Sequence, residues 1–373
     1  MNPSKVYFTN LRTKIGVSQL DKLERLIRAA GIGEIDFDHK MTAIKIHFGE
    51  PGNLTFLRPN YARRVADVVK SLGGVPFLTD CNTLYPGRRK NALEHIESVY
   101  ENGFTPYATG CQIIIGDGLK GSDDVEIPVR NGQYVKTAKI GRAIMDADVF
   151  ISLSHFKGHE ATGFGGALKN IGMGCGSRRG KMEQHAAGKP VVSKRRCVGC
   201  RQCTKQCAQD AFTYADKKAS IDHTKCVGCG RCIAACNFYA IYNPNDDAAE
   251  MLDRKMAEYA MAVVDGRPQF HISLVIDVSP YCDCHGENDM AILPDVGMFA
   301  SFDPVALDQA CADACLRQQP IPGSLLDDNM HREGFCDHHD HFKNTSPESE
   351  WQACLEHAEA IGLGSRAYEL IEV

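Results

Sequence analysis

Eight cysteines near the middle of the chain have a spacing that is typical of iron–sulfur proteins. The pattern C-x2-C-x2-C-x3-C occurs twice, as Cys197, Cys200, Cys203, Cys207 and as Cys226, Cys229, Cys232, Cys236. A [4Fe-4S] cluster takes four cysteine thiolates, and in two-cluster ferredoxins the last cysteine of each repeat binds the cluster of the other repeat. The spacing therefore predicts two [4Fe-4S] clusters with crossed ligands. One is held by Cys197, Cys200, Cys203 and Cys236, and the other by Cys226, Cys229, Cys232 and Cys207.

Zinc and disulfides are the alternatives for these cysteines. Zinc sites use paired C-x2-C hooks with four ligands in total, so zinc would leave the extra cysteines of each repeat unused. Disulfides need an oxidising compartment, and no secretory segment is found at the start of the chain. Ala208 and Asn237 stand where ferredoxins usually have proline after each repeat. We expect that change to affect packing around the sulfurs and the reduction potential, not ligation.

Polar side chains follow three predicted strands at the point where each strand ends. Open α/β sheets bind ligands at the carboxyl ends of their strands, although a single polar residue there can simply face water. Because three strand ends carry similar groups, we expect them to form one pocket. The candidate catalytic residues are His155, Lys157, His159, Lys169, Cys282 and Cys284. The candidate ligand-binding residues are Lys45, His47, Asp80, Gly165 and Gly166.

The stretch from His155 to His185 is rich in glycine. Since each glycine costs backbone entropy, we expect a poor helix or strand here and a backbone that approaches a ligand closely. Residues 163–166 resemble a glycine-rich turn before a helix N-terminus, which could hold a phosphate or carboxylate, but they match neither the P-loop nor G-x-G-x-x-G. Lys157 and Lys169 would supply cations for an anionic ligand. A solvated basic loop explains the same residues equally well.

Two further clusters could bind metal. Cys282 and Cys284 form a C-x-C pair, which cannot close an unstrained disulfide, so metal binding, redox chemistry and simple burial remain open. Nearby acidic residues favour a metal or proton-transfer role. The segment from His331 to His341 contains residues that ligate zinc or iron, but surface loops of this composition are common, and we interpret it as such a loop.

Alternating strands and helices must position these groups. Strands are predicted at residues 42–48, 75–80, 111–115, 148–155 and 270–278, and helices after Ser18 and at residues 59–72, 87–102, 167–170 and 248–264. A hairpin with a type I′ turn at Asn131-Gly132 is expected between residues 125–129 and 134–140. The prediction is a mainly parallel α/β sheet with flanking helices. An inserted bacterial-ferredoxin-like α+β module spans residues 191–243, and the α/β host comprises residues 1–190 and 244–373.

Composition narrows the class of protein. The chain has 373 residues, 17 cysteines and a net charge of −5, so no electrostatic feature favours nucleic acid or an anionic membrane. No run of about 18 apolar residues is present. We therefore expect a cytoplasmic protein whose thiolates are kept for metal.

Several long motifs carry a family resemblance. IKIHFGEPGN, LTDCNTLYPGRR, SHFKGHEATGFGGALKNIGMG, CDCHGEND and FASFDPVALDQA resemble the bacterial and archaeal family called domain of unknown function 362, in its subgroup with an inserted ferredoxin domain. The similarity runs from about Thr42 to the end of the chain. It implies an uncharacterised iron–sulfur protein with no agreed substrate and an electron-transfer role.

Two function classes follow. In the first, the protein is an oxidoreductase that passes single electrons through two [4Fe-4S] clusters between a redox partner protein and an anionic ligand or cofactor in the α/β domain. In the second, the host is an isomerase- or lyase-like metal or cofactor enzyme with structural or sensory clusters, and it has a faint likeness to the lactate racemase type of fold. A pure electron carrier is a third option. Two clusters favour the first class because they form a conduction path. No nicotinamide or flavin fingerprint is present, and a bound flavin or further metal stays open.

Overall fold

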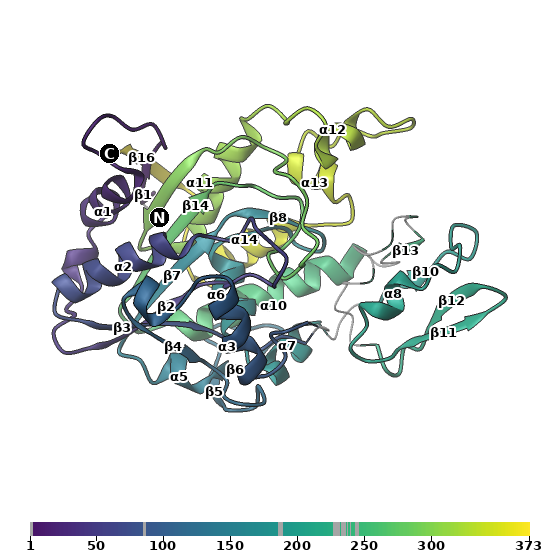
Figure 1. Ribbon diagram of the computed structural model, residues 1–373, viewed down its shortest axis with the longest axis horizontal. Helices are drawn as coiled ribbons and strands as arrows, with labels where there is room; N and C mark the ends of the chain where they lie inside the picture. Colours follow the sequence, from purple (N-terminus) through teal and green to yellow (C-terminus); the bar gives the residue numbers. More distant parts are fainter. Residues whose placement is uncertain are drawn as a thin grey trace.

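An eight-stranded sheet forms the centre of the protein in the computed structural model, which describes residues 3–84, 87–185, 189–226, 232, 236, 238, 240–242 and 246–373 (Figure 1). In spatial order its strands are β16 (Tyr368–Glu372), β1 (Ser4–Thr9), β15 (Gly297–Ser301), β14 (Gln269–Val275), β7 (Val149–His155), β2 (Met41–Lys45), β3 (Val75–Asp80) and β4 (Gln112–Ile115). β15 runs antiparallel to both neighbours, and every other adjacent pair is parallel. The prediction of a mainly parallel α/β sheet is therefore confirmed.

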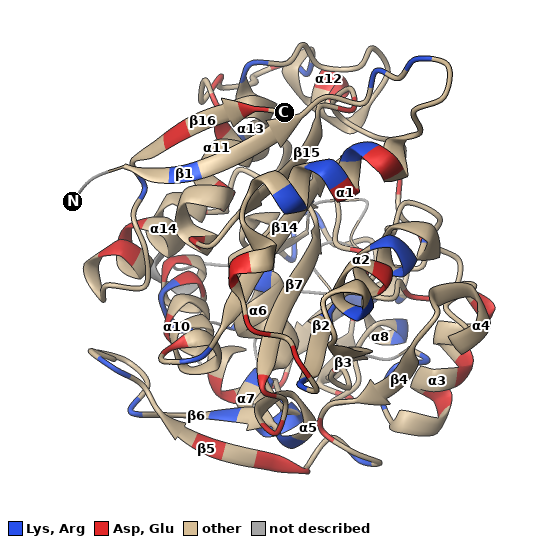
Figure 2. Ribbon diagram, turned by 90° about the vertical axis from the view of Figure 1, so that its left-hand side faces the viewer, with Lys and Arg blue, Asp and Glu red and all other residues tan. Residues whose placement is uncertain are grey.

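Helices cover both faces of this sheet, with α1 and α2 on one side and α6, α10, α11 and α14 on the other (Figure 2). Because neighbouring strand residues point to opposite faces, Phe77 and Phe150 join the core beside α6 and α10, whereas Leu78 and Ile151 join the core beside α1 and α2. The described helices are α1 (Gln19–Ala29), α2 (Pro59–Ser71), α3 (Ala92–Glu101), α4 (Pro106–Thr109), α5 (Arg142–Met145), α6 (Ala167–Cys175), α7 (Arg178–His185), α8 (Gln202–Lys205), α10 (Asp246–Val264), α11 (Pro304–Leu316), α12 (Leu325–Met330), α13 (His341–Thr345) and α14 (Trp351–Ala360), with a 3-10 turn, η1 (Ile32–Glu34).

Local signals set several helix ends. Ser18 caps α1 through a capping box with Asp21, and Pro59 is the first residue of α2, both as predicted. The predicted helix at residues 87–102 is shorter than expected. It begins after Asn91, whose side chain accepts from the amides of Leu93 and Glu94.

The hairpin is present, but its turn differs from the prediction. β5 (Asp124–Pro128) and β6 (Thr137–Gly141) pair as a separate two-stranded sheet. Asn131 has a φ of 58°, but Gly132 does not have a positive φ, so the type I′ prediction is wrong. The carboxylate of Glu258 on α10 instead accepts hydrogen bonds from the amides of Gln133 and Val135, at 2.7 and 2.6 Å, and shapes this longer loop.

The glycine-rich stretch forms regular structure, contrary to expectation. It contains β8 (Lys157–His159), β9 (Gly163–Gly165), α6 and α7. A Cβ on Gly172 would clash with the carbonyl oxygen of Met256, and one on Gly174 would lie 2.6 Å from the Lys45 ammonium. Two of these glycines therefore let α10 and Lys45 approach α6 closely, and packing outweighs their entropy cost.

The segment between α7 and α10 has secondary structure and a small core of its own. β10 (Val191–Val192) pairs with β13 (Ile241–Tyr242), and β11 (Phe212–Ala215) pairs with β12 (Lys218–Ile221). Its apolar cluster includes Cys197, Cys203, Phe212 and Ile241. Figure 1 shows these elements to one side of the large sheet. Among the described helices of the whole chain, none is long and apolar enough to span a bilayer.

Candidate functional site

A pocket of about 570 Å³, including its mouth, lies where β2 and β3 end and where β8 (Lys157–His159) begins. It is lined by Lys45, His47, Asp80, Cys81, Thr83, Arg89, Lys157, Gly166, Lys169, Asn170, Met173, Gly174, Lys181, Cys282 and Cys284. Most of the predicted site residues are therefore brought together at the carboxyl edge of the sheet, where α/β proteins bind ligands. Sequence reasoning missed Asn170, which follows Lys169 directly, and Met173, which lies one helical turn further along α6.

A buried charge network forms one wall. The ammonium of Lys45 lies 3.0 Å from Asp80 and donates to Asn170 at 2.8 Å, and Arg89 binds Glu50 at 2.8 Å. Burial opposes ionisation of Asp80, but the charges of Lys45 and its neighbours outweigh burial and hold the Asp80 pKa below its usual value. Lys45, Asp80 and Arg89 are thus all charged, and ion pairs hold them in place in this wall.

His47 lies beside this wall. Its Nε2 is 3.0 Å from the Arg89 guanidinium. Burial, followed by the charges of Arg89 and the pocket lysines, lowers the pKa of His47 well below its ordinary value. The ring is therefore neutral near pH 7.

His155 does not line the pocket, although it was predicted as catalytic. Its Nδ1 lies 2.9 Å from the Asp283 carboxylate and its Nε2 lies 2.8 Å from the carbonyl oxygen of Ile276. Lys157 approaches Asp283 at 3.3 Å. Burial opposes ionisation of Asp283, but His155 and Lys157 outweigh it, so the Asp283 pKa is lowered. His155 therefore positions the loop that carries the two cysteines.

Cys282, Cys284 and Lys169 form a second wall, and the predicted catalytic residue His159 contacts Cys282 but does not line the pocket. The Lys169 ammonium lies 3.7 Å from the Cys282 sulfur, and both thiols are buried. Burial would lower the pKa of Lys169, but Cys282, Cys284 and Glu160 outweigh it and raise that pKa. Burial lowers the pKa of His159, with Glu160 opposing, so this ring is neutral near pH 7. Among the described residues, no three His, Cys, Asp or Glu side chains gather closely enough to hold a metal ion.

Two of the pocket's cations have no carboxylate partner. Lys45, Arg89 and Lys157 each form an ion pair, whereas Lys169 and Lys181 form none with any residue that the structure describes. Lys181 contacts the backbone carbonyl oxygens of Gly174 and Gly176 instead. The pocket therefore has an excess of positive charge, which suits a phosphate or carboxylate.

The N-terminus of α6 is occupied from within the chain. The carboxylate of Asp308 accepts from the amides of Ala167 and Leu168 at 2.6 and 2.8 Å. The glycine-rich turn was expected to present these amides to a ligand, and that expectation is wrong because Asp308 already satisfies them. Gly166 faces Asp308, and Gly165 lies beside the side chains of Lys157 and Lys169.

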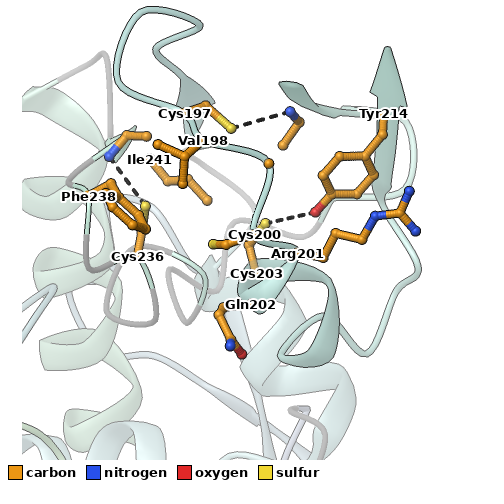
Figure 3. Close-up of a pocket in the computed structure, with 13 residues that line it drawn as sticks. Cys197, Val198, Cys200, Arg201, Gln202, Cys203, Tyr214, Cys236, Phe238 and Ile241 are labelled. Atoms are coloured by element: carbon orange, nitrogen blue, oxygen red, sulfur yellow. Dashed lines mark hydrogen bonds between the residues drawn. The ribbon is translucent and has the colours of Figure 1, made fainter. Parts of the chain in front are cut away.

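A separate hollow of about 330 Å³ brings together four predicted cluster ligands (Figure 3). Cys197, Cys200 and Cys203 of the first repeat line it with Cys236 of the second, and Cys207 is not among the lining residues. Three sulfurs have neighbouring donors: Ala219 N lies 3.4 Å from Cys197, Ala240 N lies 3.3 Å from Cys236, and the Tyr214 hydroxyl lies 3.3 Å from Cys203. The grouping is the crossed set that the spacing predicts.

The other predicted set is described only in part. Cys207 is half-buried, and the amide of Ala211 points to its sulfur at 3.5 Å. Cys226 is half-buried and Cys232 is buried, whereas Cys229 lies outside the described residues.

The histidine-rich segment forms an exposed loop, as predicted. His331 and His339 are largely exposed and face the carboxylates of Asp327 and Asp337. Cys336 is also exposed.

Comparison with known proteins gives a family and distant structural likenesses. A family model described as "Domain of unknown function (DUF362)" matches residues 42–313. The lactate racemase apoprotein from Thermoanaerobacterium thermosaccharolyticum is similar at a TM-score of 0.39 and 10% identity, covering 74% of this chain and 51% of that one. A Thermotoga maritima protein solved by the Northeast Structural Genomics Consortium is similar at a TM-score of 0.40 and 12% identity. The match covers 83% of this chain and 59% of that one. The chain thus spans about half of the length of these structures. No curated protein matches the sequence.

Proposed function

The chain belongs to the DUF362 family, and from this premise we propose that it is an iron–sulfur oxidoreductase. Two [4Fe-4S] clusters in residues 191–243, a ferredoxin-like module, would carry single electrons between a redox partner protein and an anionic ligand in the α/β pocket. The family itself supplies no activity, so the proposal depends on the two sites described above.

The observation that carries the proposal is the composition of the cysteine hollow. Three cysteines of one repeat and the last cysteine of the other line one cavity, although 33 positions separate Cys203 from Cys236. Cys197, Cys200, Cys203 and Cys236 are not in disulfides. Zinc sites use paired C-x2-C hooks with four ligands in total, so zinc would leave the extra cysteines of each repeat unused. A hollow with four cysteines spaced around it suits a larger group.

The surroundings of the hollow fit such a group. Val198 and Ile241 supply apolar walls, and the amides of Ala219 and Ala240 face the sulfurs of Cys197 and Cys236. Hydrogen bonds to cysteine sulfur stabilise negative charge and raise the reduction potential, whereas apolar surroundings lower it. These residues would therefore tune the potential of the bound group.

The pocket would bind the second reactant. Lys169 and Lys181 would offset the charge of a phosphate or carboxylate whose desolvation is otherwise costly. The paired ions Lys45, Asp80 and Arg89 would hold the wall rigid, so the ligand would meet preorganised charges.

Metal content and coupling test this function. Protein purified without oxygen should contain about eight irons and eight sulfides per chain. If the sites work together, inorganic phosphate should bind with different affinity to oxidised and to dithionite-reduced protein, because coupling is reciprocal. Zinc in place of iron would contradict the proposal.

A second candidate is an isomerase- or lyase-like enzyme with structural or sensory clusters. Neutral His47 in the pocket beside Lys157 and Lys169 favours it, since such groups suit acid–base work on an anionic substrate. Equal phosphate affinity in both redox states would support this candidate over electron transfer.

A further inference from the structure

The Cys282–Cys284 pair has surroundings that differ from those of the buried core thiols. Both cysteines line the pocket beside Lys169 and Arg89. Cys81 also lines the pocket, but burial and then the charge of Asp117 raise the pKa of its thiol well above the ordinary value. Cys311, Cys315 and Cys354 are also buried, and burial raises the pKa of each of them. The pocket pair therefore combines access to a ligand with neighbouring positive charge, and the core thiols do not.

The tautomer of His159 follows from its hydrogen bonds. Its Nδ1 accepts from the amides of Ala161 and Thr162 at 3.0 and 3.1 Å, so this nitrogen carries no proton. In the neutral ring the proton must then be on Nε2, the nitrogen left to meet Cys282 and Glu160. His159 is therefore a donor toward the cysteine pair.

Several features favour one negative charge shared by the two sulfurs. The Lys169 ammonium lies 3.7 Å from the Cys282 sulfur, and both cysteines line the same pocket. The neighbouring thiol of Cys282 lowers the pKa of Cys284, and Cys284 raises the pKa of Cys282, as expected when one thiol keeps its proton and stabilises the other as a thiolate.

Two other roles of a cysteine pair fit less well. The C-x-C spacing disfavours a disulfide between the two residues. Among the described His, Cys, Asp and Glu side chains, no group around them could hold a metal ion. In a nucleophilic role the thiolate attacks the ligand, and the excess of cations in the pocket binds the ligand's negative charge.

We propose that the Cys282–Cys284 pair is the nucleophile of the pocket and attacks an electrophilic carbon of an anionic ligand. The inference rests on the anion site of the proposed function and adds its chemistry. In the simplest such reaction, a sulfur–carbon bond forms with the thiolate electron pair, the bond from carbon to its leaving group breaks, and the leaving group departs with that bond's electrons. No oxidant or reductant is required.

Alkylation of the iron-loaded, full-length protein without oxygen tests this inference. Iodoacetate is an anionic probe and iodoacetamide is its neutral counterpart, and mass spectrometry of peptides assigns the modified cysteine. Exposed Cys336 is the internal control for an ordinary thiol, and Cys311, Cys315 and Cys354 are the controls for inert burial. The ratio of the iodoacetate rate to the iodoacetamide rate should be roughly tenfold higher at the pair than at Cys336.

Lys169→Met should lower this ratio toward that of Cys336, and inorganic phosphate should slow the reaction of the pair in the unaltered protein. An unmodified pair beside a modified Cys336, or equal ratios at both places, would overturn the inference. If the variant fails to fold, the phosphate measurement on the unaltered protein decides the question. Undiminished labelling of the pair at saturating phosphate would also overturn the inference. Iron content is measured on the same samples. If the protein contains no iron but the pair is labelled rapidly, the result would contradict the proposed function and leave the inference about the cysteine pair standing.

Discussion

Replacing Lys169 by Met should separate ligand binding from stability. Lys169 lines the pocket, and its ammonium faces the Cys282 sulfur and no carboxylate that the structure describes. Met keeps most of the length of the side chain and removes only the charge. Because Lys169 forms no ion pair with a described carboxylate, the fold should tolerate its loss better than that of Lys45, which pairs with Asp80.

The size of the binding effect follows from Coulomb's law. At an effective dielectric constant of about 20, a unit charge about 5 Å from a bound anion contributes roughly 3 kcal/mol. Lys169 is half-buried, so solvent reduces this contribution. We expect a loss of roughly 1.4–3 kcal/mol, which is about a 10- to 150-fold increase in Kd.

Lys45→Met gives the contrasting case. It would leave Asp80 buried without its nearest cation and should cost roughly 3–5 kcal/mol of unfolding free energy. Lys14→Met, at an exposed lysine, is the matched control. Calorimetric titration with inorganic phosphate at low salt measures Kd, and denaturant unfolding measures stability. Unchanged phosphate affinity in Lys169→Met, or an equal loss in Lys14→Met, would refute the charge argument.

Two further predictions concern the packing of α6. Burial raises the pKa of Asp308 to about 7, against the two amide hydrogen bonds that lower it. The folded state therefore binds a proton that the unfolded state has lost, and the free energy of unfolding should fall as pH rises from about 5 to about 7, by roughly 2–3 kcal/mol. Asp308→Asn should remove this part of the slope in denaturant unfolding at several pH values, and an unchanged slope would show that Asp308 is not the group responsible. Gly172→Ala should cost roughly 1–3 kcal/mol in the same assay because its Cβ meets the Met256 carbonyl, whereas Gly33→Ala, with open space around it, should change little.

The sequence predicted features that depend on local patterns. The strand at residues 75–80 and the cap at Ser18 follow from neighbours in the chain, and the structure has both. The four cysteines that the spacing assigns to one cluster also line one hollow, whereas their binding of iron stays a prediction.

Features that depend on distant residues could not be predicted. Asp308 occupies the α6 N-terminus from about 140 positions away, and Glu258 shapes the hairpin loop from about 125. His155 ends a strand as predicted, but its ring bonds to Asp283 and Ile276 instead of facing the pocket. Strand-end position indicates which edge a residue occupies, whereas the direction of its side chain depends on partners that only the fold brings near.

Iron content of paired cysteine variants tests the central claim most directly. With crossed ligands, Cys197→Ala with Cys236→Ala removes two ligands of the same cluster and should leave about four irons per chain. Cys197→Ala with Cys207→Ala removes one ligand from each cluster when the ligands are crossed, and it should leave close to none. Cys336→Ala, at an exposed cysteine outside both repeats, should keep about eight. Retention of about four irons in the Cys197 and Cys207 variant together with loss of nearly all iron in the Cys197 and Cys236 variant would contradict the crossed arrangement. Absence of iron from the unaltered protein would contradict the iron–sulfur function itself.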